Sequence, residues 1–314
     1  MKPKISVVII TYNQEKIVSR AIESVIKQRD YIFELILSDD CSKDNTWEIL
    51  KEYKSNYPSI VKIFKNSENL GIFKHIEKTW EYPTGDLIFY LAGDDEFEDN
   101  VFKITAKYIL DNIPDYKTNF FTIYLDYKAV LPNGSFYIKR NNLLNKFDPI
   151  SLKIRGLITN RTTGVSVNVL KAYKSVKNIG IYTDGLQDIQ TQIYSQVNYY
   201  IPFVGSIYYK NIGVGASIAF NDAISSKIML YQKYKDIVNK KNDILWLNYQ
   251  IIRNELILKF HIKKYIDFIL GYIINLTLKY GITYFFSELK HFIFTHYLIL
   301  KRNCNILCLF GKKY

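Results

Sequence analysis

The first 95 residues alternate between short apolar runs and segments whose apolar residues recur at helical spacing. The apolar runs span residues 5–10, 33–37, 60–64 and 87–93, and each is typical of a short buried strand. Connections of this length, with helical patterns inside them, join parallel strands through right-handed crossovers. The pattern therefore predicts an α/β fold with a mostly parallel central sheet and flanking helices.

Side chains suited to binding follow three of these predicted strands. They are Thr11, Tyr12, Asn13, Asp39, Asp40, Asp94 and Asp95. Because the exits of parallel strands lie on one edge of a sheet, we expect these residues to converge on one crevice. Adjacent carboxylates repel each other, so a divalent metal that holds a phosphate is one interpretation of the last pair. An acidic cap on the next helix is the other interpretation.

Two common phosphate-binding signatures are missing after the first predicted strand. The sequence has no G-x-G-x-x-G dinucleotide fingerprint and no G-x-x-x-x-G-K-[ST] P-loop. A nucleotide bound at this edge would therefore rely on metal-bridged phosphates and a stacked base.

Four motifs carry a resemblance to a known family. They are VIITYN at residues 8–13, SDDCSKDNT at 38–46, NLG at 69–71, and TGD at 84–86 followed by LAGDD at 91–95. In this order and spacing they resemble the family 2 glycosyltransferases, closely over residues 4 to about 105 and more weakly to about 220. The resemblance implies the GT-A fold with a Rossmann-like nucleotide-binding half. It also implies an inverting reaction, a nucleotide-sugar donor that is usually UDP-linked, and Mn²⁺ or Mg²⁺ as cofactor.

The same resemblance assigns roles to the residues at the strand ends. Tyr12, between Thr11 and Asn13, is expected to flank the nucleobase, and Asp40 to hydrogen-bond it, with Asp39 supporting that loop. Asp95 corresponds to the metal-binding aspartate of the D-x-D signature. Asp94 is expected to lie against the ribose or the metal. Ala92 stands where the first acidic residue of that signature usually is, so the metal is expected to take most of its ligands from the diphosphate.

The resemblance places a general base well downstream, at the start of a helix. Asp188 fits best, since Ile189, Ile193 and Val197 follow it at helical spacing, and Asp184 is the alternative. Gln187 stands where the family usually has an acidic residue. A helix cap is the structural interpretation of Asp188.

The organisation follows from these matches. Residues 1–220 are expected to form the catalytic domain, with a nucleotide-sugar half over 1–105 and an acceptor half over 106–220. The second half is predicted to hold a hairpin over 119–139 with its turn at Pro132-Asn133-Gly134. It is also predicted to hold a strand over 161–170, a strand from Pro202 to Tyr209, and a segment at 210–218 that closes over the diphosphate. Residues 221–314 are predicted to be a helical, basic and aromatic region.

Charge and composition limit the kinds of partner that the sequence predicts. The net charge is +12, but no nucleic-acid recognition motif accompanies it, so no nucleic acid is expected. The basic helical region is consistent with contact with the inner membrane surface, or with packing on the catalytic domain or in an oligomer. The longest apolar run in that region, residues 265–278, is too short to span a membrane. Three scattered cysteines and the absence of a signal peptide predict a cytoplasmic protein, and the basic helical region is consistent with a peripheral position on the cytoplasmic face of the membrane.

The sequence therefore predicts an inverting, metal-dependent transferase. It would move a sugar from a nucleotide-sugar donor to a growing cell-surface glycan or a lipid-linked oligosaccharide. A nucleotidyltransferase would normally show a glycine- and lysine-rich loop after the first strand, which residues 11–15 are not. A non-catalytic protein that binds a nucleotide sugar or a glycan is the other alternative, because of Ala92 and Gln187.

Overall fold

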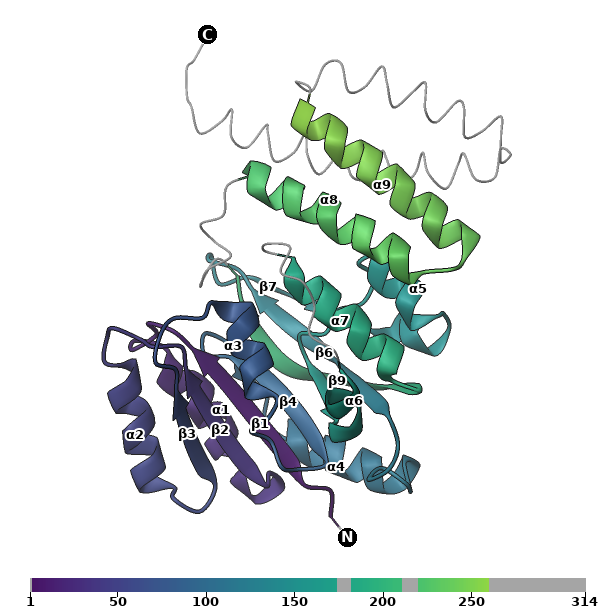
Figure 1. The fold of residues 1–314 in the computed structure, drawn as a ribbon. Coiled ribbons are helices and arrows are strands. Elements are labelled where there is room, and N and C mark those ends of the chain that lie inside the picture. Colours follow the sequence, from purple (N-terminus) through teal and green to yellow (C-terminus); the bar gives the residue numbers. More distant parts are fainter. Residues whose placement is uncertain (1, 174–181, 211–219, 260–314) are drawn as a thin grey trace, which may run out of the picture. The chain divides into compact units, whose positions relative to one another are not determined.

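The computed structural model describes residues 2–173, 182–210 and 220–259 (Figure 1). Its strands are β1 (Ile5–Thr11), β2 (Glu34–Asp39), β3 (Val61–Lys65), β4 (Leu87–Ala92), β5 (Glu96–Phe97), β6 (Phe121–Val130), β7 (Phe136–Lys139), β8 (Thr163–Ser166) and β9 (Val197–Tyr209). Its helices are α1 (Val18–Ile26), α2 (Thr46–Asn56), α3 (Ile72–Thr79), α4 (Val101–Asn112), α5 (Pro149–Ile154), α6 (Val167–Ala172), α7 (Thr183–Tyr194), α8 (Phe220–Ile237) and α9 (Lys241–Lys259). Two short 3₁₀ turns lie at Arg29–Tyr31 and Asn142–Asn145.

The first four strands confirm the predicted alternation. They lie in the order β3-β2-β1-β4, and all three pairings are parallel. In the register of this sheet, Thr11 pairs with Asp39 and Ile10 pairs with Ala92. The exits of β1, β2 and β4 therefore lie side by side, as the sequence predicted.

The second half of the sheet mixes directions. β8 pairs antiparallel with both β4 and β6, and β9 runs parallel to β6. The predicted hairpin is confirmed: β6 and β7 are antiparallel, and Gly134 in the turn has a φ of 79°. The register of β6 against β9 shifts on both sides of Asp126, opposite the stretch that holds Pro202.

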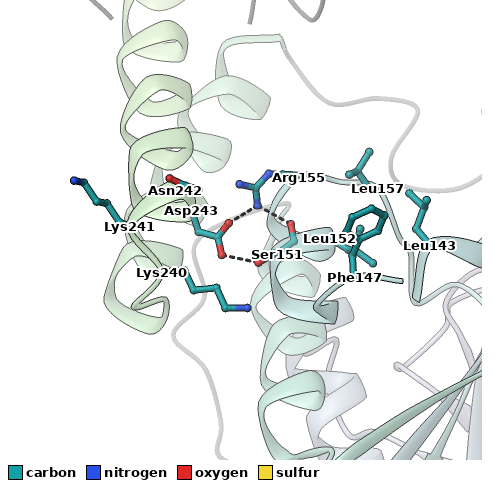
Figure 2. Close-up of a pocket in the computed structure, with 10 residues that line it drawn as sticks. All are labelled: Leu143, Phe147, Ser151, Leu152, Arg155, Leu157, Lys240, Lys241, Asn242 and Asp243. Atoms are coloured by element: carbon teal, nitrogen blue, oxygen red, sulfur yellow. Dashed lines mark hydrogen bonds and ion pairs between the residues drawn. The ribbon is translucent and has the colours of Figure 1, made fainter. Parts of the chain in front are cut away.

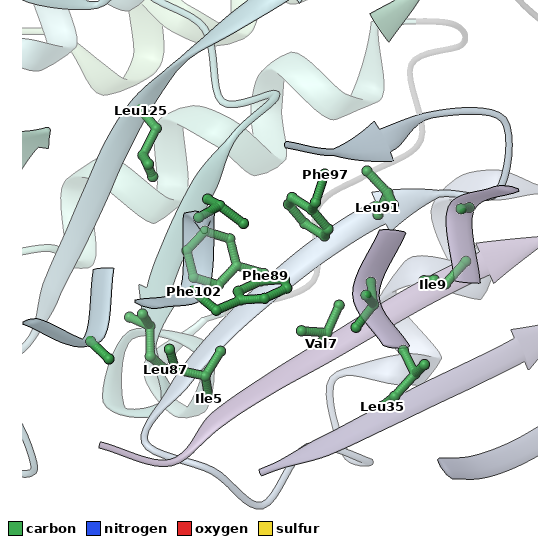
Figure 3. Close-up of a cluster of buried hydrophobic side chains, with 14 of the residues drawn as sticks. Ile5, Val7, Ile9, Leu35, Leu87, Phe89, Leu91, Phe97, Phe102 and Leu125 are labelled. Atoms are coloured by element: carbon green, nitrogen blue, oxygen red, sulfur yellow. The ribbon is translucent and has the colours of Figure 1, made fainter. Parts of the chain in front are cut away.

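Apolar side chains cover both faces of the sheet because successive strand residues point to opposite sides. Ile5, Val7 and Ile9 of β1 pack with buried residues of α1, α2 and α4 in the larger cluster (Figure 3). Val8 and Ile10 pack on the other face, with partly buried residues of α3 and α6. The parallel strands are thus buried on both faces, which explains their continuous apolar sequence.

Helices α7 and α8 share a separate apolar cluster with α5 and the first half of α9. Leu186 and Ile189 of α7 pack there with Tyr231 and Tyr234 of α8 and with Leu247 of α9. The helical pattern expected beyond about residue 225 is therefore present in the described part, and the first compact unit ends at Ile251. No helix among the described residues is long and apolar enough to cross a membrane. The predictions for 211–218 and for the region from 260 onward lie outside the described residues.

A buried glutamate ties four segments together at the amino-terminal edge of the sheet. The Glu34 carboxylate accepts hydrogen bonds from Ser6 Oγ at 2.6 Å and from the Thr84 N–H at 2.6 Å. Its other oxygen lies 2.6 Å from Lys62 Nζ. These contacts join β2 to β1, to β3 and to the turn before β4. They fix the strands at the edge opposite to the predicted site.

Burial opposes ionisation of Glu34, but Lys62, Ser6 and Thr84 together hold its pKa below the ordinary value of 4.5. The ionised carboxylate therefore stabilises the fold above about pH 4.5, and this stabilisation is lost as the pH falls through the lowered pKa. We predict that Glu34→Gln lowers the free energy of unfolding by about 1–3 kcal/mol at neutral pH. The difference from wild type should shrink below about pH 4.

Urea unfolding at a series of pH values measures this difference. Glu52→Gln, at an exposed position of α2, is the matched control and should leave stability unchanged. A Glu34→Gln variant as stable as wild type at neutral pH would contradict the assigned role.

Candidate functional site

The loops that follow β1 and β2 are hydrogen-bonded to each other. The Asn13 N–H donates to Ser42 Oγ at 2.8 Å, and Asn13 Oδ1 accepts the Lys43 N–H at 2.8 Å. The Gln14 N–H donates to Thr46 Oγ1 at 2.8 Å. Asn13 adopts a φ of 51°, in the left-handed region that asparagine tolerates better than most residues. The two loops therefore form one supported unit.

Tyr12 is the residue that this unit leaves open to solvent. Its side chain is 39% exposed, and no ring contact within the described residues engages it. Thr11 beside it is buried and donates its hydroxyl to Gln14 Oε1 at 2.7 Å. Of the three predicted residues at the end of β1, Thr11 and Asn13 hold the loop by hydrogen bonds, and Tyr12 presents an aromatic ring to solvent.

Asp39 and Asp40 are both buried and serve the surrounding loops. Asp39 accepts the Ser42 N–H at 3.1 Å, which fits its predicted supporting position. Asp40 accepts the Leu70 N–H and the Gly71 N–H, each at 2.9 Å, and the Asn66 side-chain amide at 2.7 Å. Three of the roughly four acceptor positions of its carboxylate are thus occupied, with a single hydrogen bond on Oδ2, and the residue is 2% exposed.

Asp94 and Asp95 lie where β4 ends, next to the exit of β1. The Gly93 N–H donates to the Ile10 carbonyl at 2.9 Å, which holds this turn against β1. Asp95 Oδ1 accepts the Tyr209 N–H at 3.2 Å, and its Oδ2 lies 3.9 Å from Nη1 of Arg161. The structure therefore brings the end of β9 to the acidic pair.

Nearby arginines balance the negative charge of Asp94 and Asp95 only in part. Burial raises the pKa of Asp94, and burial together with the charge of Asp94 raises the pKa of Asp95 to about 7. The positive charges of Arg161 and Arg20 oppose both shifts without cancelling them. A further cation at this position would relieve the repulsion.

Arg20 of α1 contacts the backbone of Asp94 and the side chain of Glu96. Its guanidinium donates to the Asp94 carbonyl at 2.7 Å, and its Nε lies 3.0 Å from Glu96 Oε1. The same group stacks on the Tyr209 ring at 3.8 Å, and the Tyr209 hydroxyl donates to Glu96 at 2.5 Å. Arg20 is thus committed to holding β4, β5 and β9 together.

The prediction that a helix begins at Asp188 is wrong. α7 begins at Thr183, so Asp184 lies in its first turn and Asp188 in its second. The negative charge of Asp184 is favoured there by the helix dipole. Val197 belongs to β9 and is 45% exposed, so it does not continue the apolar face of the helix.

The two α7 carboxylates differ in their surroundings. Asp188 forms an ion pair with Lys153 of α5, whose side chain is only 11% exposed. Asp184 has no such partner among the described residues, and solvent reaches it. The surrounding protein and the charge of Asp188 nevertheless raise the pKa of Asp184 to about 6. Solvent screening moderates this shift.

The acidic pair at β4 suits a hard divalent cation. No group of three or more metal-ligating side chains occurs within the described ranges, so the protein offers two neighbouring carboxylates. Mg²⁺ typically binds through one or two carboxylates plus substrate phosphates and water. The donor set therefore fits an ion that arrives with a diphosphate.

A cavity of about 670 Å³ lies away from this edge, between α5 and the start of α9 (Figure 2). Ser151 of α5 and Arg155, which follows α5, both contact Asp243, with Ser151 Oγ donating at 2.6 Å. The charges of Arg155 and Asp243 therefore neutralise each other. This cavity contains none of the predicted site residues.

Three cations at the site were not predicted from the sequence: Arg20, Lys153 and Arg161. Each meets its acidic partner through contacts between distant segments, such as the 35 positions that separate Lys153 from Asp188. Arg161 lies in the stretch predicted as a strand at 161–170, two residues before β8 begins. The position of Arg161 at the start of a predicted strand was the only sequence feature that could have indicated its place near the site.

Comparison with known proteins identifies a sequence family that this chain matches. The sequence model described as Glycosyl transferase family 2 matches residues 6–166, about half of the chain. EpsE of Bacillus subtilis (strain 168) is 37% identical over 93 residues. That alignment covers 30% of this chain and 34% of EpsE, so the chain spans about a third of that relative's length.

Two solved structures share the fold. Staphylococcus aureus TarS 1-349, in complex with UDP-GlcNAc, has a TM-score of 0.59 at 16% identity over 81% of this chain and 72% of that one. The mannosyltransferase PcManGT from Pyrobaculum calidifontis, in complex with GDP-Man and Mn²⁺, has a TM-score of 0.54 at 13% identity over 93% and 79%. At these identities the likeness concerns the fold, which agrees with the predicted GT-A type.

Proposed function

The chain belongs to glycosyl transferase family 2, and from this premise we propose that it moves one sugar from a nucleotide-sugar donor to a glycan acceptor with inversion. The observation that carries the proposal is the convergence of three strand exits on one edge. There the exposed Tyr12, the Asp40 loop and the Asp94/Asp95 pair share a supported framework. We keep the division into a donor half (1–105), an acceptor half (106–220) and a helical region from 221 as part of this proposal.

We propose that the nucleotide is UDP. Tyr12 offers an exposed ring for stacking, and the buried Asp40, whose Oδ2 accepts one hydrogen bond from Gly71, would accept the N3–H of uracil as a second. Thr11 and Asn13 would act by holding the loop, and Asp39 by supporting the turn after β2. TarS, which shares the fold, was solved with UDP-GlcNAc.

Asp95, with Asp94, would hold Mn²⁺ or Mg²⁺ at the donor diphosphate. The raised pKa values of both groups reflect a negative charge that nearby arginines balance only in part, and a bound divalent cation would lower both values. When bound, the ion would stabilise the charge on the departing diphosphate. PcManGT, another protein of this fold, was solved with Mn²⁺.

A carboxylate on α7 would take the proton from the acceptor hydroxyl. We assign this role to Asp188, with Asp184 as the alternative. Asp184 gains support from its solvent access and from its pKa near 6, since a base works best when its pKa lies near the working pH. Asp188, held by Lys153, would then keep that pKa raised.

The acceptor would be a growing cell-surface glycan or a lipid-linked oligosaccharide. Contact with the inner membrane surface, or oligomer formation, through the region beyond 221 belongs to the same proposal. The high basic charge of the chain suits an anionic surface.

We predict that Asp95→Asn abolishes sugar transfer and weakens UDP binding at least about tenfold in the presence of Mn²⁺, because one hard oxygen ligand is lost. Isothermal titration with UDP, with Mn²⁺ and then with a chelator, measures the change. Asp99→Asn, at an exposed position four residues on, is the matched control. Full transfer activity in Asp95→Asn would remove the metal assignment.

We predict that Asp188→Asn lowers the transfer rate by about 10²–10⁴-fold while UDP affinity stays within about twofold, because a base acts on the acceptor and not on the nucleotide. Asp184→Asn, assayed in parallel for UDP release and UDP affinity, decides between the two carboxylates. If Asp188→Asn weakens UDP binding as strongly as Asp40→Ala does, its assignment as the base is wrong. Donor binding with no turnover in the wild type would favour the non-catalytic alternative.

A further inference from the structure

Arg161 is held at the donor edge by a rigid backbone. The neighbouring Thr159 N–H donates to Asn141 Oδ1 at 3.0 Å, and the buried Asn141 amide donates to the Thr159 carbonyl at 3.1 Å. On the other side, the Thr162 carbonyl accepts the Leu125 N–H at 3.0 Å. The segment before β8 is thus fixed to β6.

The Arg161 side chain is oriented by aromatic rings. Its guanidinium lies 3.5 Å from the centre of the Tyr208 ring and 5.9 Å from that of Tyr127. Its Nη1 lies 3.9 Å from Asp95 Oδ2, which is too far for a hydrogen bond. Within the described residues no acceptor is hydrogen-bonded to this guanidinium, and the side chain is 42% exposed.

The positive charge of Arg161 influences carboxylates of both acidic groups of the site. The charge of Arg161 acts on Asp94 and Asp95 at the end of β4 and also on Asp184 of α7. Two other cations that contact carboxylates of the site are occupied, Arg20 by Glu96 and Lys153 by Asp188. Arg161, beside Asp95, instead has hydrogen-bond donors that are open to a ligand within the described residues.

We propose that Arg161 binds the β-phosphate of the nucleotide sugar, which adds a residue to the machinery of the proposed function and rests on it. The planar guanidinium matches two phosphate oxygens, and stacking on Tyr208 restricts its orientation before the ligand arrives. Its guanidinium lies beside Asp95, and its charge also lowers the pKa of Asp184, so a phosphate held by it would lie beside the proposed metal and within electrostatic reach of α7.

The role in the reaction follows from charge. The bond between the anomeric carbon and the β-phosphate oxygen breaks, and its electron pair stays on that oxygen. The acceptor hydroxyl oxygen forms the new bond to carbon, and its proton passes to the α7 carboxylate. Arg161 stays protonated throughout and donates hydrogen bonds to the phosphate as its negative charge grows.

Titration calorimetry with UDP, UMP and uridine tests this proposal, with Mn²⁺ and again with a chelator. We expect Arg161→Ala to weaken UDP binding roughly 10- to 100-fold under both conditions. UMP and uridine, which lack the β-phosphate, should bind within about twofold of wild type. Arg161→Lys keeps the charge but loses the planar fork, and should fall between the two.

Arg29→Ala is the matched control, since it removes an exposed arginine from the 3₁₀ turn before β2, at the opposite edge of the sheet. UDP binding to Arg161→Ala at wild-type strength would overturn the inference and leave the proposed function intact. Equal losses for UDP, UMP and uridine would also overturn it, because they would indicate a disturbed loop and not a lost phosphate contact. A wild type that binds none of UDP, GDP or dTDP would overturn the proposed function itself.

Discussion

The parallel pairing of β1 with β2 and β4 is the constraint on which the rest of the structure depends. It sets Thr11 beside Asp39 and Ile10 beside Ala92, so residues far apart in the chain leave the sheet at one edge. The opposite edge is fixed by the buried Glu34, which ties the strands where no ligand is expected. With one edge fastened, the loops of the other edge are positioned by strand register and by their own hydrogen bonds.

This arrangement concentrates negative charge, and the molecule compensates for it only in part. Arg20 and Lys153 are each committed to a protein partner, and the pKa of Asp95 is still raised to about 7. A structure that selection had optimised for stability alone would neutralise such a pair or replace it. The remaining imbalance is what a site for a cation and a diphosphate requires, because the ligand then completes the charge balance.

The sequence predicted what depends on local pattern and missed what depends on distant contacts. Strand and helix alternation is visible in the spacing of apolar residues, and the convergence of Asp40 with Asp95 follows from parallel topology. The start of α7 was misplaced because Asp188 and Asp184 both suit a helix terminus, and only packing of Leu186 and Ile189 decides between them. The position of Arg161 beside Asp95 could not be predicted, because it depends on the pairing of β6 with β8 and β9, which joins segments far apart in the chain.

The central claim is that these strand exits form one nucleotide-binding edge, and amide hydrogen exchange with and without UDP and Mn²⁺ tests it most directly. The account predicts slower exchange on binding in the loops at residues 11–15, 39–46, 66–71 and 93–96, with no change around Glu34 at the opposite edge. Protection confined to the cavity between α5 and α9, with these four loops unchanged, would contradict it.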